Sequence, residues 1–271
     1  GNITVGNVET GTGNVRADGD VTIETGKGDV NIVKTVASDN GSVSVKSQEG
    51  NILVGNNGPD VDTVTAKQNI DLYVADGVIT VNGKTETEQG DITVQARDED
   101  TDRNIVIEQN GQLVSGRDLT LHTYNGGIEV TDDTTAKRNL TVIVENKGGV
   151  TFANNVEVTG NISADVKEGS VAIGENLTAG QDISVKTGEG NISVGADVTA
   201  VEGNVTMASQ GGDITVGADV SAGKSVTMDT SSGNIRVEDD VTAGEKATLT
   251  TGAGNITVGN VETGTGNVRA D

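Results

Sequence analysis

The sequence predicts an all-β fold, a right-handed parallel β-helix (β-solenoid) in which short strands stack coil on coil. Three observations carry this prediction: a repeat of about 21–22 residues, alternating apolar and polar residues in short strands, and a Gly-rich composition with few aromatic residues. Period-two alternation is typical of half-buried strands. A period near twenty residues with Gly, Asn and Asp between strands is typical of solenoid coils. The right-handed sense is expected from the handedness of parallel crossovers.

Three strand types recur in the C-terminal half. A long strand appears as DISVKT, NVTMAS, SVTMDT and KATLTT, and a second strand follows it as GNISVG, GDITVG, GNIRVE and GNITVG. A shorter third element reads ADVTA, ADVSA and DDVTA. Three strands in each repeat predict a triangular coil with short strands and a narrow Val/Ile core. The predicted core residues are Ile183, Val205 and Val226 in the long strand, Ile192, Ile214, Ile235 and Ile256 in the second, and Val198, Val220 and Val241 in the third.

The long-strand register continues back to the N-terminus. Its inward positions there are Val21, Val43, Ile70, Ile92, Leu119, Leu140 and Ile162. Two of the intervals are longer than the others, and the segments 55–66 and 96–104 within them are predicted to be loops that protrude at a corner. The first of these segments contains Pro59, which has no N–H to donate to a strand ladder. We therefore predict one continuous solenoid over residues 1–271.

A second repeat is much longer. Residues 1–18 reappear without a change as residues 254–271, so 1–253 forms one long repeat unit of about 11 coils and 254–271 begins the next copy. With strands ~4.8 Å apart along the stack, such a unit spans about 53 Å. We expect the chain to be a segment of a longer array that continues beyond both ends. Covalent tandem repeats and separate chains joined end to end both remain open.

Charge and composition exclude several classes of protein. The net charge of −23 disfavours nucleic acid and anionic lipid as partners, and no apolar run is long enough for membrane insertion. Cysteine is absent, which excludes disulfide scaffolds and thiolate metal sites. We expect no cofactor and no membrane insertion. The expected partners are neighbouring copies of the same repeat, in tandem or end to end.

The coils over residues 190–228, GNISVGADVTAVEGNVTMASQGGDITVGADVSAGKSVTM, resemble the repeats of large exported bacterial adhesins. These are the filamentous haemagglutinin and high-molecular-weight adhesin type of two-partner-secreted β-solenoid proteins, and the resemblance extends along the whole chain. It implies an extracellular shaft on a cell surface or in a secreted fibre. It also implies that surface glycans or proteins of a host or neighbouring cell are bound by parts of the protein outside this segment.

Two kinds of candidate site stand out. Eight Asn-X-Ser/Thr triplets are candidate glycosylation sites, although the coil pattern of a corner Asn followed by a strand generates such triplets by itself. They begin at Asn2, Asn40, Asn139, Asn161, Asn176, Asn191, Asn204 and Asn255. The acidic residues Asp98, Glu99, Asp100 and Asp102 form a weak calcium candidate, because they lack the spacing of a known calcium loop.

No catalytic constellation is evident, so the chain is predicted not to be an enzyme. The single histidine, His122, falls at an outward position of DLTLHTY, and no nucleophile motif accompanies it. The leading functional hypothesis is the shaft of a long bacterial surface or secreted fibre. The alternative is a subunit of a self-assembling extracellular matrix or sheath filament. A carbohydrate- or calcium-binding module would require an aromatic or carboxylate cluster to form on folding.

Overall fold

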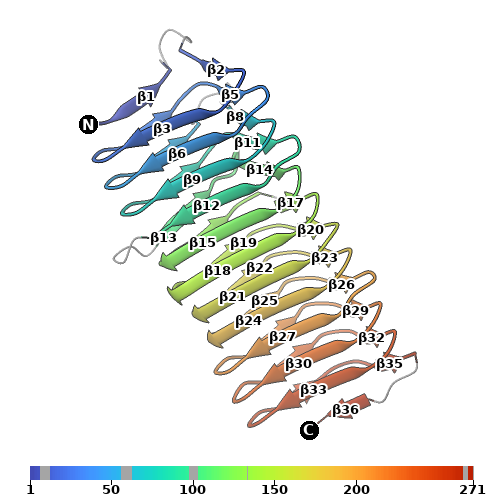
Figure 1. Ribbon diagram of the computed structural model, residues 1–271. Coiled ribbons are helices and arrows are strands. Elements are labelled where there is room, and N and C mark those ends of the chain that lie inside the picture. Colours follow the sequence, from blue (N-terminus) through green and yellow to red (C-terminus); the bar gives the residue numbers. More distant parts are fainter. Residues whose placement is uncertain (7–12, 56–62, 98–102, 133, 265–267, 271) are drawn as a thin grey trace. The chain divides into compact units, whose positions relative to one another are not determined.

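The computed structural model describes residues 1–6, 13–55, 63–97, 103–132, 134–264 and 268–270. The chain divides into two compact units, residues 1–137 and residues 138–271. Each unit is a stack of parallel β-coils, and each complete coil gives one strand to each of three sheets (Figure 1). No helix occurs among the described residues. The predicted all-β parallel solenoid with three short strands per coil is therefore confirmed.

The strands of unit 1 are as follows, in their order within each sheet. Sheet 1 contains β1 (Ile3–Val5), β4 (Val30–Ile32), β7 (Ile52–Val54), β10 (Ile79–Val81), β13 (Arg103–Ile107) and β16 (Gly127–Val130). Sheet 2 contains β2 (Val15–Ala17), β5 (Val36–Ser38), β8 (Thr63–Ala66), β11 (Lys84–Thr87), β14 (Gln112–Ser115) and β17 (Thr134–Ala136). Sheet 3 contains β3 (Val21–Thr25), β6 (Val43–Ser47), β9 (Ile70–Val74), β12 (Ile92–Ala96) and β15 (Leu119–Asn125).

Unit 2 repeats the arrangement. Sheet 1 contains β19 (Val150–Phe152), β22 (Val171–Ile173), β25 (Ile192–Val194), β28 (Ile214–Val216), β31 (Ile235–Val237) and β34 (Ile256–Thr257). Sheet 2 contains β20 (Val156–Val158), β23 (Leu177–Ala179), β26 (Val198–Ala200), β29 (Val220–Ala222), β32 (Val241–Ala243) and β35 (Val261–Thr263). Sheet 3 contains β18 (Leu140–Lys147), β21 (Ile162–Glu168), β24 (Ile183–Glu189), β27 (Val205–Ser209), β30 (Val226–Thr230), β33 (Ala247–Thr251) and β36 (Val268–Ala270).

Like residues stack on like residues between successive coils. Val205 pairs with Val226, and Met207 with Met228, in parallel register. Their side chains are fully buried, whereas Thr206 and Thr227 on the same strands face outward and are partly exposed. Nine of the ten predicted core residues are at most 1% exposed. The tenth, Ile256 in β34, is half-buried.

Buried hydroxyl groups satisfy the backbone where the chain turns from sheet 3 into sheet 1. The Ser209 Oγ donates to the Gly190 carbonyl at 2.8 Å and accepts from the Gly212 N–H at 2.8 Å. The Thr230 Oγ1 repeats this pattern one coil later, at 2.8 Å from the Gly212 carbonyl and 3.0 Å from the Gly233 N–H. These hydroxyls therefore remove the cost of burying polar backbone at the corner.

Glycine is required at the same corner, because the chain passes very close to the coil before it. Gly169 and Gly190 have φ angles of +148° and +146°. A Cβ atom on Gly190 would lie 2.2 Å from the carbonyl oxygen of Gly169. Both the backbone conformation and the close approach exclude a side chain there.

The two identical 18-residue segments begin in the same sheet but end in different ones. Their first strands, β1 and β34, both lie in sheet 1. In unit 1, Val15–Ala17 form β2 and pair with β5 in sheet 2. In unit 2 the same three residues, Val268–Ala270, form β36 and pair with β33 in sheet 3. There, Val261–Thr263 take the place in sheet 2 as β35. The same three residues therefore take different strand positions in the two copies.

The two predicted corner loops are only partly described. The first is shorter than expected, because Thr63–Ala66 at the end of segment 55–66 form β8 of sheet 2. The second, predicted over 96–104, is also shorter, because Ala96 ends β12 and Arg103 begins β13. Residues 56–62, with Pro59, and residues 98–102 lie outside the described residues.

Candidate binding surfaces

The predicted calcium residues cannot be placed, since Asp98, Glu99, Asp100 and Asp102 all lie outside the described residues. Within the described ranges, no group of three or more His, Asp or Glu side chains is arranged to hold a metal ion. The calcium site stays a prediction.

The candidate glycosylation residues lie at the corners that precede strands, where they form ladders between coils. In the ladder before sheet 1, the Asn2 Oδ1 accepts from the Asp29 N–H at 3.0 Å, and the Asp29 Oδ1 accepts from the Asn51 N–H at 2.9 Å. Further along this corner, the Asn191 Oδ1 accepts from the Asp213 N–H at 2.9 Å, and Asn255 donates its N–H to the Asn234 Oδ1 at 2.9 Å. Each side-chain oxygen thus holds the backbone of the next coil.

The corners before sheets 2 and 3 carry the same ladder. Before sheet 3, the Asn161 N–H donates to the Asn139 Oδ1 at 2.8 Å, and the Asn204 N–H donates to the Asp182 Oδ1 at 2.8 Å. Before sheet 2, the Asn176 Oδ1 accepts from the Asp197 N–H at 3.2 Å. A short polar side chain at these positions replaces the water that would otherwise solvate the corner backbone.

Several candidate glycosylation residues also use the side-chain nitrogen. The Nδ2 groups of Asn161, Asn176 and Asn204 donate to the Oδ1 of the preceding rung at 2.9–3.1 Å. The Nδ2 of Asn40 donates to the Asp18 Oδ1 at 2.7 Å. A glycan is joined through this nitrogen, so glycosylation at these four residues would compete with the ladder. Glycosylation at all eight triplets remains a prediction.

One ladder carboxylate is held in its charged form. Hydrogen bonds from the backbone N–H and the side-chain amide of Asn204 lower the pKa of Asp182, and the nearby charge of Lys224 acts in the same direction. Burial opposes this shift more than Lys224 favours it, but less than the hydrogen bonds from Asn204 do. The charge of Asp182 therefore strengthens the hydrogen bonds of this rung.

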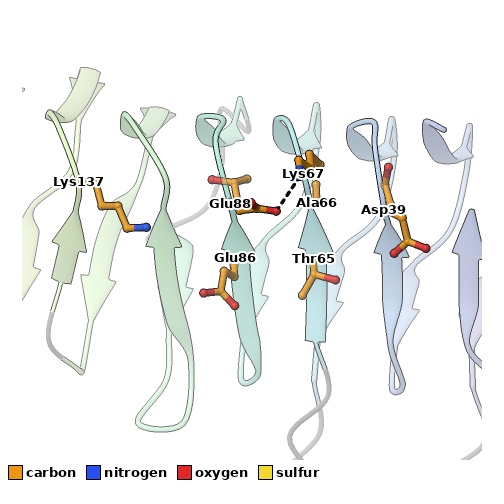
Figure 2. A pocket seen from close by; sticks show the side chains of 9 residues that line it. Asp39, Thr65, Ala66, Lys67, Glu86, Glu88 and Lys137 are labelled. Atoms are coloured by element: carbon orange, nitrogen blue, oxygen red, sulfur yellow. Dashed lines mark ion pairs between the residues drawn. The ribbon is translucent and has the colours of Figure 1, made fainter. Parts of the chain in front are cut away.

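A shallow hollow lies on the outer side of sheet 2 in unit 1 (Figure 2). It is lined by Ser38, Asp39, Thr65, Ala66, Lys67, Glu86, Thr87, Glu88 and Lys137. The Lys67 Nζ lies 3.3 Å from the Glu88 carboxylate, as the dashed line in Figure 2 marks. Glu86 pairs with Lys84 at 2.7 Å, and Asp39 pairs with Arg16 at 2.8 Å. Asp39 thereby raises the pKa of the Arg16 guanidinium.

The chemistry of this hollow is that of a solvated ion-pair surface. The carboxylates of Asp39, Glu86 and Glu88 each face a basic partner on the same strand or on a neighbouring coil. Its polar lining can attract water and small ions, but it offers no pairing of a nucleophile with a base.

Both tyrosines and the histidine lie on the outer face of sheet 3 in unit 1. His122 points outward from β15, as its alternation with Leu119 and Leu121 predicts, and its Nδ1 lies 3.3 Å from the Gln95 Nε2. Tyr73 on β9 and Tyr124 on β15 are also partly exposed on this face. The sequence reasoning did not single out either tyrosine. Their outward positions in the long strand are the signal that could have identified this cluster.

Comparison with known proteins gives one match. Neither the curated proteins nor the solved structures contain a match to the chain. None of the described residues forms a helix that is long and apolar enough to span a bilayer. The model of one family, described as Toastrack DUF4097, matches residues 115–271, which is more than half of the chain. This protein therefore belongs to the Toastrack DUF4097 family.

Proposed function

We propose that this chain is a structural shaft segment of a long extracellular bacterial fibre or adhesin. The observation that carries the proposal is the register of the coils: within each unit, strand follows strand in parallel pairing, and Val and Ile stack on Val and Ile. Such stacking makes each coil a template for the next, so length can grow by adding coils without changing the interior.

Two sets of contacts make each stack stiff. Backbone hydrogen bonds join every described coil to its neighbour within a unit, and the corner ladders of Asn and Asp add a second line of bonds at the edges. A side chain that accepts a backbone N–H contributes roughly 0.5–1.5 kcal/mol. A bent stack would have to break these bonds together, so we expect resistance to bending.

The location and the partners belong to the same proposal. The repeats resemble those of filamentous haemagglutinin-type adhesins, and that resemblance favours export to the cell surface. The net charge of −23 disfavours nucleic acid and favours solubility of a long fibre. Neighbouring copies of the repeat, in tandem or end to end, are the proposed partners, with adhesion carried by parts outside this segment.

Electron microscopy of the native, unfragmented protein tests the proposal. Single thin fibres with an axial repeat near 53 Å, as ~4.8 Å per coil requires, would support a shaft. Ordered bundles or tubes would favour the alternative, a subunit of an extracellular matrix or sheath filament. Isolated compact particles would overturn both.

A further inference from the structure

The aromatic residues of the chain are distributed unevenly. The sequence contains two tyrosines, one phenylalanine and one histidine, and no tryptophan. Phe152 is 3% exposed in the core of unit 2. Tyr73, His122 and Tyr124 instead lie on the outer face of sheet 3 in unit 1, on β9 and β15. A solenoid core needs apolar residues inside, so packing gives no reason for rings on the outside of this one sheet.

Strand register places one of these rings in a row of polar side chains. Lys46 pairs with Tyr73, Tyr73 with Gln95, and Gln95 with His122 on successive strands. Glu24 precedes Lys46 in the same row. Successive rungs are ~4.8 Å apart, and all five positions face outward because they share the parity of the pleat. The side-chain amide of Gln95 reaches the His122 ring at 3.3 Å, so these two rungs support each other.

A groove runs along this row, and we call it the tyrosine groove. Its floor includes Leu72, and its lining includes Lys46, Gln48, Asp71, Tyr73 and Gln95. Asp71 and Tyr73 are two residues apart on β9 and therefore stand side by side on the same face. Glu24 lines the groove as well. The groove thus combines one aromatic ring with an ammonium, two carboxylates and two amides.

The chemistry of the lining selects among ligand classes. An anionic polymer is disfavoured, since the carboxylates of Glu24 and Asp71 outnumber the single ammonium of Lys46 in the groove. An apolar protein surface is disfavoured because one ring offers too little apolar area for a stable interface. A neutral sugar matches both the ring and the polar groups of the lining. Its C–H face packs against an aromatic ring, and its hydroxyls donate to carboxylates and accept from amides and the ammonium.

We propose that the tyrosine groove binds a neutral, extended oligosaccharide, with one sugar on the ring of Tyr73 and its neighbours along the row from Lys46 to Gln95. The evenly spaced rungs offer a polar partner to each sugar of an extended chain. This site lies within the solenoid itself and does not depend on the shaft proposal. It would make unit 1 a binding surface as well as a structural element.

The corresponding groove of unit 2 provides a matched contrast. Ile143, Asp165 and Lys186 occupy the same row on β18, β21 and β24, paired in register. They line a groove with Glu145, Lys167 and Gln210, and no aromatic ring takes part. The proposal therefore predicts that sugar binding depends on unit 1 and not on the groove of unit 2.

Titration of the full chain with neutral hexasaccharides tests the site. The probes are chitohexaose, cellohexaose and, as an anionic comparison, a heparin hexasaccharide. Calorimetry measures the affinity, and tyrosine fluorescence gives a second readout that comes only from Tyr73 and Tyr124, because the chain has no tryptophan. We expect saturable binding of at least one neutral probe, a change in tyrosine emission, and no binding of the heparin probe. Absence of binding to both neutral probes, or preference for the heparin probe, would overturn the proposal.

Substitutions then locate the site. Tyr73→Ala should weaken binding by about tenfold or more, whereas Tyr73→Phe should keep most of the affinity because the ring remains. Tyr124→Ala removes the other tyrosine of the same sheet, which does not line the groove, and Asp165→Ala alters the groove of unit 2. Both should bind like the native protein. Equal affinity of Tyr73→Ala and the native protein, with the fold confirmed by circular dichroism, would refute the assignment.

Discussion

The two units share one coil design but differ at its corners. In unit 2 the sheet 3 strands begin at short and nearly constant intervals, at residues 140, 162, 183, 205, 226, 247 and 268. In unit 1 they begin at residues 21, 43, 70, 92 and 119, so two of the intervals are longer by several residues. The residue after each sheet 2 strand is charged in unit 1 at every turn but that of Gly116, whereas none of these residues is charged in unit 2. In unit 1 they include Asp39, Lys67 and Glu88, and in unit 2 they are Gly180, Gly223, Gly244, Gly264, Thr159 and Val201.

This difference separates what the fold requires from what it allows. Inward positions are mostly Val, Ile, Leu or Ala in both units, with a few Met, Phe, Ser and Thr, because the narrow interior admits only apolar or small side chains. Corners and outer faces vary freely, and unit 1 uses this freedom for charged turns and for the tyrosine groove. Regions that vary around a constant scaffold are where binding functions are usually found. Four predictions test how far this separation holds.

The largest effect is expected from a charge placed in the core of unit 2. Val226 is fully buried between Val205 and Ala247. Val226→Asp would bury a carboxylate without a partner and cost several kcal/mol. Hydrogen exchange should increase in the coils from β27 to β33, while unit 1 keeps its protection, because each coil contacts only its neighbours. Thr227→Asp, one residue away on the outer face, is the control and should leave exchange nearly unchanged. A uniform loss of protection in both units would contradict the coil-by-coil account.

A smaller effect is expected at the glycine corner, which is common to both units. Gly190→Ala in unit 2 and Gly50→Ala in unit 1 each place a Cβ within 2.5 Å of backbone atoms of the preceding coil, at φ angles of +146° and +139°. Each should cost about 1–3 kcal/mol, measured as a lower midpoint of thermal unfolding. Gly211→Ala, where the nearest atom is 3.7 Å away, serves as the control. If only one of the two corner variants is destabilised, the corner is not a shared requirement.

The third prediction concerns the stability of the fold at acidic pH. The pKa of Asp182 lies below its ordinary value of 3.8 in the folded chain, because Asn204 donates two hydrogen bonds to its carboxylate. A group whose pKa falls on folding stabilises the fold above its unfolded pKa, and this contribution is lost as the pH falls through the folded value. Asp182→Asn should therefore be less stable than the native chain near neutral pH, by about 1 kcal/mol at most because the group is exposed.

Comparison of the two proteins across pH isolates this one group from the other carboxyls. The difference in unfolding midpoint should shrink toward zero below about pH 4. If the two unfolding midpoints instead differ by the same amount at every pH, at acidic as at neutral pH, the charge of Asp182 plays no part in stability.

Most of the fold could be predicted from the sequence, because the pattern that specifies it is local and repeated. Each long strand alternates inward and outward residues, as in Val205, Thr206 and Met207, and the inward residues are buried in every long strand from β3 to β30. Nine of ten predicted core residues are fully buried for this reason. The corner Asn and Asp ladders follow from the same periodicity.

The sheet taken by a strand could not be predicted in one case, and the reason is instructive. Val15–Ala17 and Val268–Ala270 have the same sequence, yet they lie in sheet 2 and sheet 3. A short Val-polar-Ala strand suits either sheet. In unit 1 the choice is made by Val21, which begins β3 of sheet 3 only six residues after Val15. Strand position thus depends on the spacing to the next strand as well as on local pattern.

The tyrosine groove was missed for a different reason. Tyr73, Gln95 and His122 are separated by about a coil length each, so each looks like an isolated surface residue in the sequence. Only the pairing of β9, β12 and β15 brings them into one row. Sequence periodicity predicted that His122 faces outward but gave no reason to consider the three residues together.

The smallest effect is expected from the charged turns of unit 1. The Lys67–Glu88 pair has an N–O distance of 3.3 Å and joins side chains that are 32% and 63% exposed. Such pairs contribute roughly 0.2–1 kcal/mol and are screened by salt. A double-mutant cycle of Lys67→Ala and Glu88→Ala should give a coupling of about 0.5 kcal/mol at low salt, and almost none in about 1 M NaCl. Since unit 2 has only uncharged residues at the corresponding turns, a coupling well above this range would mean that unit 1 depends on its charges for stability. The charged residues at these turns would then be required for the stability of unit 1, and would not be positions that can vary without effect.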